Sequence, residues 1–388
     1  MITTSLPIAN ELSGSKHDVN LMKYFSDTRY LIMVLTHGCN LRCNYCGAGA
    51  TEANSPVMSL TMAKRIADIF FSFSQCDFIQ VQFHGGEPLL LSDAWYHEVV
   101  QHINDLSNQY GKKTIYGIQT NGTLLTEQRI KQFRLLNVNL SVSFDGTPAI
   151  NDLWRSCGKT VERSLQLLEG AGRDPGIILV LHKDNCSHIK DILTYFENNN
   201  WTKLKILTLQ PLGNYRSEDN LCGVKIFNAF RDTIEYQSES AKMYECVTMK
   251  MVDSYVNGRR KGQMNCAEME CQAGRYSVAI DYNGDISPCN SNTWGEKIGN
   301  ILTGFNLKKA REVVASFHRK DRWYTRCFSC PARRICMYGC TLSWKNNIPA
   351  REGECRATRL LYDYFDSHSG MIHKLYENKK AQTSIAFH

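Results

Sequence analysis

The chain has 388 residues, of which 43% are hydrophobic, and a formal net charge of +7. This suffices for one large α/β domain and a smaller one. Basic residues are dispersed, in short runs such as 259–261 and 333–334, so we expect no nucleic-acid partner. No stretch approaches the roughly 18 to 20 apolar residues of a membrane span, and the N-terminus lacks an export signal. We therefore expect a cytoplasmic protein with no membrane partner.

The first segment, 1–27, reads as an N-terminal extension that could add a strand or a cap to the next domain. From 28 to 222, β-rich apolar runs alternate with helical patterns, as in a parallel sheet with crossover helices. The predicted strands are Tyr30–His37, Phe78–His84, Thr114–Thr120, Asn139–Phe144, Gly176–His182 and Lys203–Gln210.

Helices are predicted between these strands, several of them opened by Ser, Thr or Asp caps. They are Thr61–Ser74, Ser92–Tyr110, Thr126–Leu136, Val161–Ala171 and His188–Asn198. Periodicity alone allows a partial barrel or an open doubly wound sheet. In both folds, functional residues gather at the carboxyl ends of the strands.

The rest of the chain divides by composition. Residues 223–262 read as a helical connector, and 263–356 as a cysteine-rich, metal-dependent domain. Residues 357–388 read as a C-terminal helix and tail.

Three cysteines follow the first predicted strand in the segment HGCNLRCNYCGAGA: Cys39, Cys43 and Cys46. The chain has 16 cysteines, and without an export signal these indicate metal binding more than disulfides. Three thiolates can hold three irons of a four-iron cluster and leave the fourth open to a ligand. The spacing alone also allows a zinc site or ordinary buried thiols.

Tyr45, directly before the last of these cysteines, completes a pattern that resembles the signature of the radical S-adenosylmethionine (SAM) superfamily. Three further segments stand at successive strand ends, where that family has its SAM contacts. They are His84–Pro88 (HGGEP), Gln119–Gly122 (QTNG) and Ser143–Gly146 (SFDG), the last followed by Arg155. Each alone could be a common turn, but the ordered set favours the family.

The resemblance implies a partial (β/α)6 TIM barrel in which the three cysteines hold a 4Fe-4S cluster. It implies SAM bound to the open iron and cleaved to methionine and a 5′-deoxyadenosyl radical, with an electron from a donor such as flavodoxin or ferredoxin. The cofactor-binding residues it implies are Tyr45, Gly85, Gly86, Glu87, Thr120, Asn121, Ser143, Asp145 and Arg155.

A second cysteine set resembles the SPASM domain, which carries auxiliary iron-sulfur clusters in its relatives. The resemblance implies two auxiliary 4Fe-4S clusters, and so three clusters in all. Their ligands would be Cys266, Cys271, Cys289 and Cys340 for one cluster, and Cys327, Cys330, Cys336 and Cys355 for the other. A pair of zinc ribbons is the alternative.

Radical SAM enzymes with SPASM domains mostly modify peptides, so the resemblance implies a precursor peptide as partner. One interpretation is a maturase of ribosomally made peptides that installs a side-chain crosslink, similar to the cyclophane (triceptide) and darobactin synthases. Thioether formation and epimerisation remain open.

The alternative is an anaerobic sulfatase-maturating enzyme, which forms formylglycine. In that group an aspartate follows the second SPASM cysteine and is thought to act as base. Here Asn290 follows Cys289, and an amide cannot serve as a base.

The catalytic base is not identified by any motif. Asp281, Asp285 and Glu296 lie near Cys289 in the sequence and are weak candidates. A non-catalytic iron-sulfur or zinc protein is the alternative of a different class, which the HGGEP segment disfavours because a closed structural site needs no approach for a ligand. The sequence names neither the substrate peptide nor the oligomeric state.

Overall fold

The computed structural model describes residues 16–258, 271–292, 297–318, 327, 329–336, 340 and 348–383. Within these residues the strands form one 11-stranded sheet in the order β11-β10-β9-β8-β1-β2-β3-β4-β5-β6-β7. Strands β1 to β6 are adjacent in chain order and parallel. A doubly wound sheet would reverse its order at a switch point, so this is a partial barrel.

All six predicted strands are confirmed, with ends displaced by one to three residues. The strands are β1 (Tyr30–Val34), β2 (Phe78–His84), β3 (Lys113–Thr120), β4 (Val138–Ser143), β5 (Gly176–Leu181), β6 (Lys203–Thr208), β7 (Tyr244–Glu245), β8 (Ser277–Asp281), β9 (Asp285–Ser287), β10 (Gly299–Asn300) and β11 (Gly304–Phe305). The first predicted strand ends early because the chain turns into the cysteine loop.

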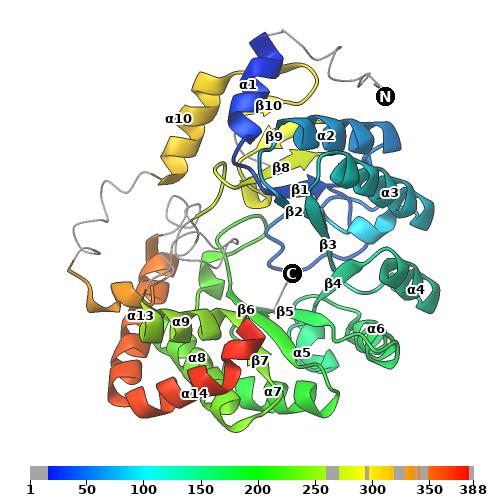
Figure 1. Cartoon of the computed structure of the whole chain (residues 1–388). Coiled ribbons are helices and arrows are strands. Elements are labelled where there is room, and N and C mark those ends of the chain that lie inside the picture. The colour runs from blue at the N-terminus through cyan, green and yellow to red at the C-terminus, as the bar shows by residue number, and fades with distance from the viewer. Residues whose placement is uncertain are drawn as a thin grey trace.

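The helices line the outer side of the curved sheet (Figure 1). They are α1 (Lys16–Phe25), α2 (Leu60–Phe73), α3 (Asp93–Gln109), α4 (Glu127–Leu135), α5 (Pro148–Asp152), α6 (Gly158–Gly170), α7 (Ile189–Asn198), α8 (Gly223–Glu239), α9 (Cys246–Asn257), α10 (Leu307–His318), α13 (Ile348–Ser367) and α14 (Ser369–Thr383), with the 3-10 turns η1 (Pro88–Leu90), η2 (Ser217–Asp219), η3 (Asn290–Asn292) and η4 (Pro331–Arg334). The predicted caps Ser92 and Thr126 are present at α3 and α4, where each accepts from a backbone N–H three residues on. The helix predicted from Thr61 begins at Leu60, and its cap is Ser59.

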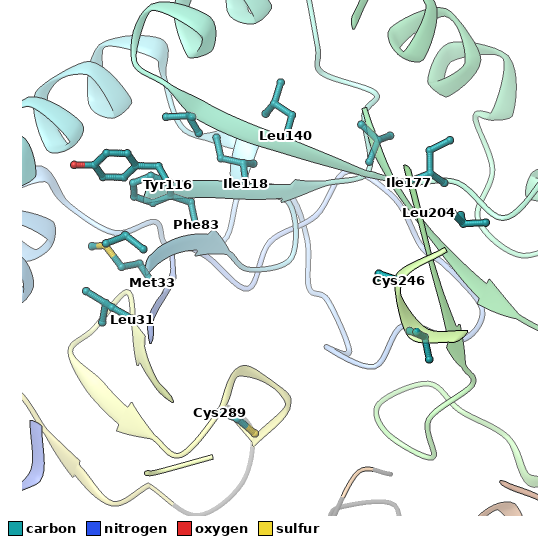
Figure 2. Packing of buried hydrophobic residues seen from close by; sticks show 14 of the residues in the cluster. Leu31, Met33, Phe83, Tyr116, Ile118, Leu140, Ile177, Leu204, Cys246 and Cys289 are labelled. Atoms are coloured by element: carbon teal, nitrogen blue, oxygen red, sulfur yellow. The ribbon is translucent and has the colours of Figure 1, made fainter. Parts of the chain in front are cut away.

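The hydrophobic core lies between the sheet and these helices. Every second residue of a strand faces it, and side chains such as Met33, Phe83 and Ile118 follow one another from strand to strand (Figure 2). This period of two leaves the alternate residues to face the inside of the barrel.

The inner face differs between parts of the sheet. Ile32, Val34 and Ala279 make it apolar on β1 and β8, whereas the inner face of β2 to β4 carries polar, partly buried side chains. Gln82, Gln119 and Ser141 belong to it, and each retains some solvent exposure. Parallel sheets are normally apolar on both faces. A polar inner face at the carboxyl ends of the strands therefore marks where a ligand can bind.

Strands from the cysteine-rich part of the chain extend this same sheet. β8 pairs in parallel with β1, from Tyr30 opposite Ser277 to Val34 opposite Asp281, and β9 to β11 continue beyond it. The N-terminal helix α1 lies beside β11, where Asn20 donates to the Phe305 carbonyl at 3.3 Å. The segment expected to add a strand or cap is thus a helical cap over the described range.

At the opposite edge of the sheet, α13 packs on α8 and α14 packs on α9 (Figure 1). In the part of the chain that the structure describes, no helix is long and apolar enough to cross a membrane.

Candidate functional site

The first three cysteines lie on the loop that leaves the carboxyl end of β1. Backbone hydrogen bonds fasten this loop to distant segments: Asn44 N donates to Trp154 O at 2.8 Å, and Asn214 N donates to Cys46 O at 3.0 Å. Gly213, with φ +59°, permits the second contact because a Cβ atom there would lie 2.1 Å from Cys46 O. The loop is therefore held from both sides of the barrel mouth.

The environment of these thiols fits a cluster. Cys39 Sγ accepts from Leu41 N at 3.4 Å and from Asn121 Nδ2 at 3.7 Å, contacts that stabilise a thiolate. Burial raises the pKa of Cys43 to about 11, with nearby Arg155 opposing the shift. Iron binding would supply the positive charge that these buried thiols otherwise lack.

The HGGEP segment packs backbone against backbone on the residues before Cys39. Gly86 N donates to Thr36 O and Glu87 N donates to Gly38 O, both at 2.8 Å. A Cβ atom on Gly86 would lie 2.2 Å from Gly38 O. The glycines expected to let backbone approach a ligand thus bring this segment against the cysteine loop.

Glu87 is fully buried and joins two of the predicted segments, HGGEP and QTNG. Its Oε1 accepts from Thr120 Oγ1 at 2.7 Å and from Leu89 N at 2.9 Å, and its Oε2 accepts from Asn121 N at 2.7 Å. Burial raises the pKa of Glu87, and these hydrogen bonds oppose the rise. The side chain that the resemblance assigns to SAM is therefore also a structural link between β2 and β3.

Tyr45, Asp145 and Arg155 form one hydrogen-bonded group. The Tyr45 hydroxyl donates to Asp145 Oδ2 and accepts from Arg155 Nη1 at 2.7 Å. Asp145 is fully buried, and its Oδ1 accepts from Val180 N at 2.9 Å. Ser143, at the end of β4, is also buried. The structure thus brings together predicted residues from three segments.

Two aromatic residues that the sequence did not single out complete this side of the site. Trp154 stacks on His182 with ring centroids 4.9 Å apart, and Tyr45 lies 6.4 Å from the same imidazole. His182 directly follows β5 and is fully buried, and burial lowers its pKa. The signal that could have found it is a polar residue at the carboxyl end of a strand.

Asp281 ends β8 and faces the cysteine loop. Its Oδ2 lies 2.9 Å from His37 Nε2 and 3.5 Å from Lys297 Nζ, and only 2% of Asp281 is exposed. Asp285, the second base candidate, instead pairs with Asn300 in the β9–β10 ladder. Glu296, the third, lies outside the described residues.

His84 faces Asn290 across the inner wall. Gly85 N donates to His84 Nδ1 at 2.8 Å, so the proton of the neutral ring is on Nε2. Asn290 Nδ2 lies 3.2 Å from Nε2. With the two ends of the Asn290 amide exchanged, its oxygen would accept from Nε2–H. Burial lowers the pKa of His84. Asn290 itself supplies hydrogen bonds and no base, and the lone pair on His84 Nδ1 already accepts from Gly85 N.

The second cysteine set is described in part. The turn after Cys271 and the strand before Cys289 are joined, since Gly274 N donates to Pro288 O at 2.9 Å. Cys327, Cys330 and Cys355 belong to a second group. Burial raises the pKa of Cys327, and the nearby Cys355 and Cys330 raise it further. Cys336 and Cys340 are half-buried, and Cys266 lies outside the described residues.

Among the described His, Cys, Asp and Glu side chains, no three converge on a point where one metal ion could bind. Ligands of a cubane cluster are spread around its corners, whereas those of zinc surround a single ion.

Comparison with known proteins identifies relatives along most of the chain. Residues 33–196 match the Radical SAM superfamily model. A cysteine-type anaerobic sulfatase-maturating enzyme of Clostridium novyi is 25% identical over 82% of this chain and 89% of its own length. Mycofactocin maturase of Mycolicibacterium smegmatis is 26% identical over 79% of this chain and 76% of its own length.

Solved structures share the fold. Native anSMEcpe with bound AdoMet (SAM) superposes with a TM-score of 0.75 at 19% identity, over 89% of this chain and 99% of that one. Streptococcus suis SuiB bound to precursor peptide SuiA superposes with a TM-score of 0.58 at 16% identity, over 90% of this chain and 80% of that one.

Proposed function

Since the chain is an enzyme with a radical SAM domain, we propose that it joins two side chains of a ribosomally made precursor peptide. The observation that carries this choice is Asn290, an amide where formylglycine chemistry would need a base, beside a His84 ring whose Nδ1 already accepts from Gly85 N. Peptide-modifying proteins among the relatives and fold neighbours support a peptide substrate.

The proposed cofactors are a 4Fe-4S cluster on Cys39, Cys43 and Cys46, SAM, and two auxiliary clusters in the segment 263–356. When bound, the first cluster and SAM would supply a hydrogen-abstracting radical, and an auxiliary cluster would supply an electron acceptor. The Tyr45–Asp145–Arg155 group is proposed to orient the SAM carboxylate and ribose, because it presents a fixed guanidinium beside the cysteine loop.

The peptide chemistry balances as a two-hydrogen oxidation. A side-chain carbon of the peptide gives up one hydrogen atom and forms a bond to an aromatic ring carbon. The ring then gives up one proton and one electron as it recovers aromaticity. No peptide bond is broken, and the product differs from the substrate by two hydrogens.

We propose Asp281, paired with His37, as the acceptor of that proton. Asp281 is the carboxylate candidate on the inner wall, and its contact with His37 brings it to the mouth of the barrel. Lys297 Nζ lies 3.5 Å from the same carboxylate oxygen and can pair with it.

Formylglycine formation is the second candidate. It is supported by the 25% identity to the Clostridium novyi enzyme over most of both chains. Asn290, which stands where sulfatase-maturating enzymes have an aspartate, argues against formylglycine formation.

The test is co-expression of the protein with an aromatic-rich candidate precursor peptide and with a sulfatase-derived peptide, under anaerobic conditions. We expect the first peptide to lose two hydrogens and to show linked fragments in tandem mass spectrometry. A Cys43→Ala variant should yield neither this product nor 5′-deoxyadenosine.

An aldehyde-reactive hydrazide separates the two candidates, because serine-derived formylglycine also differs from its precursor by two hydrogens. Hydrazide labelling of the sulfatase peptide, with no linked fragments from the other, would replace the crosslinking proposal with sulfatase maturation.

A further inference from the structure

The N-terminal helix α1 carries a buried hydroxyl that the proposed function does not use. Tyr24 packs its ring on Phe305 of β11, with centroids 5.0 Å apart. Its hydroxyl is buried and, among the described residues, has no hydrogen-bond partner. Leaving such a group unpaired costs about 1–3 kcal/mol, so its position calls for an acceptor.

The hydroxyl points toward the turn that links the two cysteine-bearing segments. A Cβ atom on Gly274 would lie 3.0 Å from the Tyr24 hydroxyl oxygen, and Gly274 has a φ of +68°. Gly274 N in turn donates to Pro288 O, the residue before Cys289. A glycine at this turn lets the phenol reach the edge of the proposed auxiliary site.

Electrostatics place Cys289 near the same hydroxyl. Burial raises the pKa of Tyr24, and a Cys289 thiolate raises it further. Cys289 itself is buried on the loop after β9 (Figure 2). The geometry at Gly274 and Pro288 thus brings a buried hydroxyl, a hydrogen-bond donor, to the residue before Cys289, and a ligated cysteine sulfur is an anionic acceptor.

We propose that the Tyr24 hydroxyl donates a hydrogen bond to the Cys289 sulfur when that sulfur ligates the auxiliary cluster, which makes α1 part of the cofactor site. This rests on the proposed auxiliary cluster. Hydrogen bonds to cluster sulfurs stabilise the reduced, more negative state and so raise the reduction potential. Tyr24 would thereby make this cluster a better electron acceptor.

The test is the variant Tyr24→Phe, which removes only the hydroxyl. A background in which Cys39, Cys43 and Cys46 are replaced by alanine isolates the auxiliary clusters, and their potentials are measured by redox titration followed by electron paramagnetic resonance. We expect one auxiliary potential to fall by the equivalent of about a tenfold change in the oxidised-to-reduced ratio, or about 59 mV for one electron. The other should stay unchanged.

Tyr116→Phe is the matched control, since this buried tyrosine has its hydroxyl on Asn104 of the helical layer. It should leave both potentials unchanged. A Tyr24→Phe protein that keeps both clusters with unaltered potentials would overturn the inference. A parent protein whose iron and sulfide show no auxiliary cluster would instead refute the proposed cofactor set.

A measurement on the parent protein tests the same hydrogen bond even if the Tyr24→Phe variant loses its cluster. Electron–nuclear double resonance should detect a proton near the auxiliary cluster that exchanges in deuterated buffer. Absence of any exchangeable proton coupled to that cluster would overturn the hydrogen bond without a substitution.

Discussion

Asp281 and Asp285 flank one tight turn, yet they have different surroundings. Asp281 contacts His37 and Lys297 on the inner wall, whereas Asp285 accepts hydrogen bonds from Asn283 and Asn300 at the turn. Of these two carboxylates, only the first contacts His37, the residue that leads into the cysteine loop. The two residues therefore form a matched pair for testing the proposed proton acceptor.

Asp281→Asn should lower formation of the linked peptide on the order of 10²-fold or more, since a positioned base contributes about 10² to 10⁴. Formation of 5′-deoxyadenosine should continue, because the cysteine loop and SAM contacts remain. Liquid chromatography of both products checks this. Asp285→Asn should leave both unchanged; equal loss of the two products in Asp281→Asn would indicate a structural role instead.

The sequence could predict the chemistry of the cysteine loop but not the partners of its residues. Cys39, Cys43 and Cys46 are readable because cluster ligation fixes their types and spacing. The His37–Asp281 contact could not be predicted from the sequence, because it depends on β8 pairing with β1 across most of the chain. His84 and Asn290 meet for the same kind of reason, through segments that no local pattern connects.

At the scale of elements, α4 holds the turn that follows HGGEP. Arg129 donates through Nη1 to Leu89 O at 2.6 Å and through Nη2 to Leu91 O at 2.7 Å, and its Nε lies 2.6 Å from Asp93 Oδ1. One guanidinium thus fixes both ends of η1, directly after Glu87. A lysine offers no such planar fork.

We expect Arg129→Lys to lower the free energy of unfolding by about 1–3 kcal/mol, because at least one of these carbonyls loses its donor. SAM affinity should fall as well, since Glu87 loses its fixed position. Urea denaturation and equilibrium dialysis measure the two effects. Arg134→Lys is the control on the same helix, where a single exposed bond reaches Ala171 O. Unfolding curves that coincide for all three proteins would contradict the assigned role.

The helices and strands of the barrel could be predicted from the sequence because the burial and capping patterns that define them involve residues close together in the chain. The Ser92 and Thr126 caps begin helices where the apolar period changes from two to 3.6. β8 is a short, fully buried strand that pairs in parallel with β1, far earlier in the chain, with Ser277 opposite Tyr30. The expected second domain therefore contributes strands to the first domain's sheet, which periodicity could not reveal.

At the scale of the molecule, the C-terminal cysteine segment is fastened to the barrel by Glu354. This carboxylate, beside Cys355 on α13, accepts from Thr208 Oγ1 at the end of β6 and from Gln210 Nε2 at 3.3 Å. Its other oxygen pairs with Arg351. The three donors converge from two elements far apart in the sequence, so the carboxylate links the segment of the proposed second auxiliary cluster to the carboxyl end of β6.

Glu354→Ala should loosen both elements that this carboxylate joins. We expect hydrogen–deuterium exchange to rise in α13 and also in the last residues of β6 and the loop through Gln210, because both lose the same partner. Glu352→Ala, an exposed position on the same helix, should change neither. Faster exchange confined to α13 would mean that Glu354 serves only its own helix. Faster exchange in both, together with slower formation of the linked peptide and unchanged SAM cleavage, would tie this contact to the peptide step.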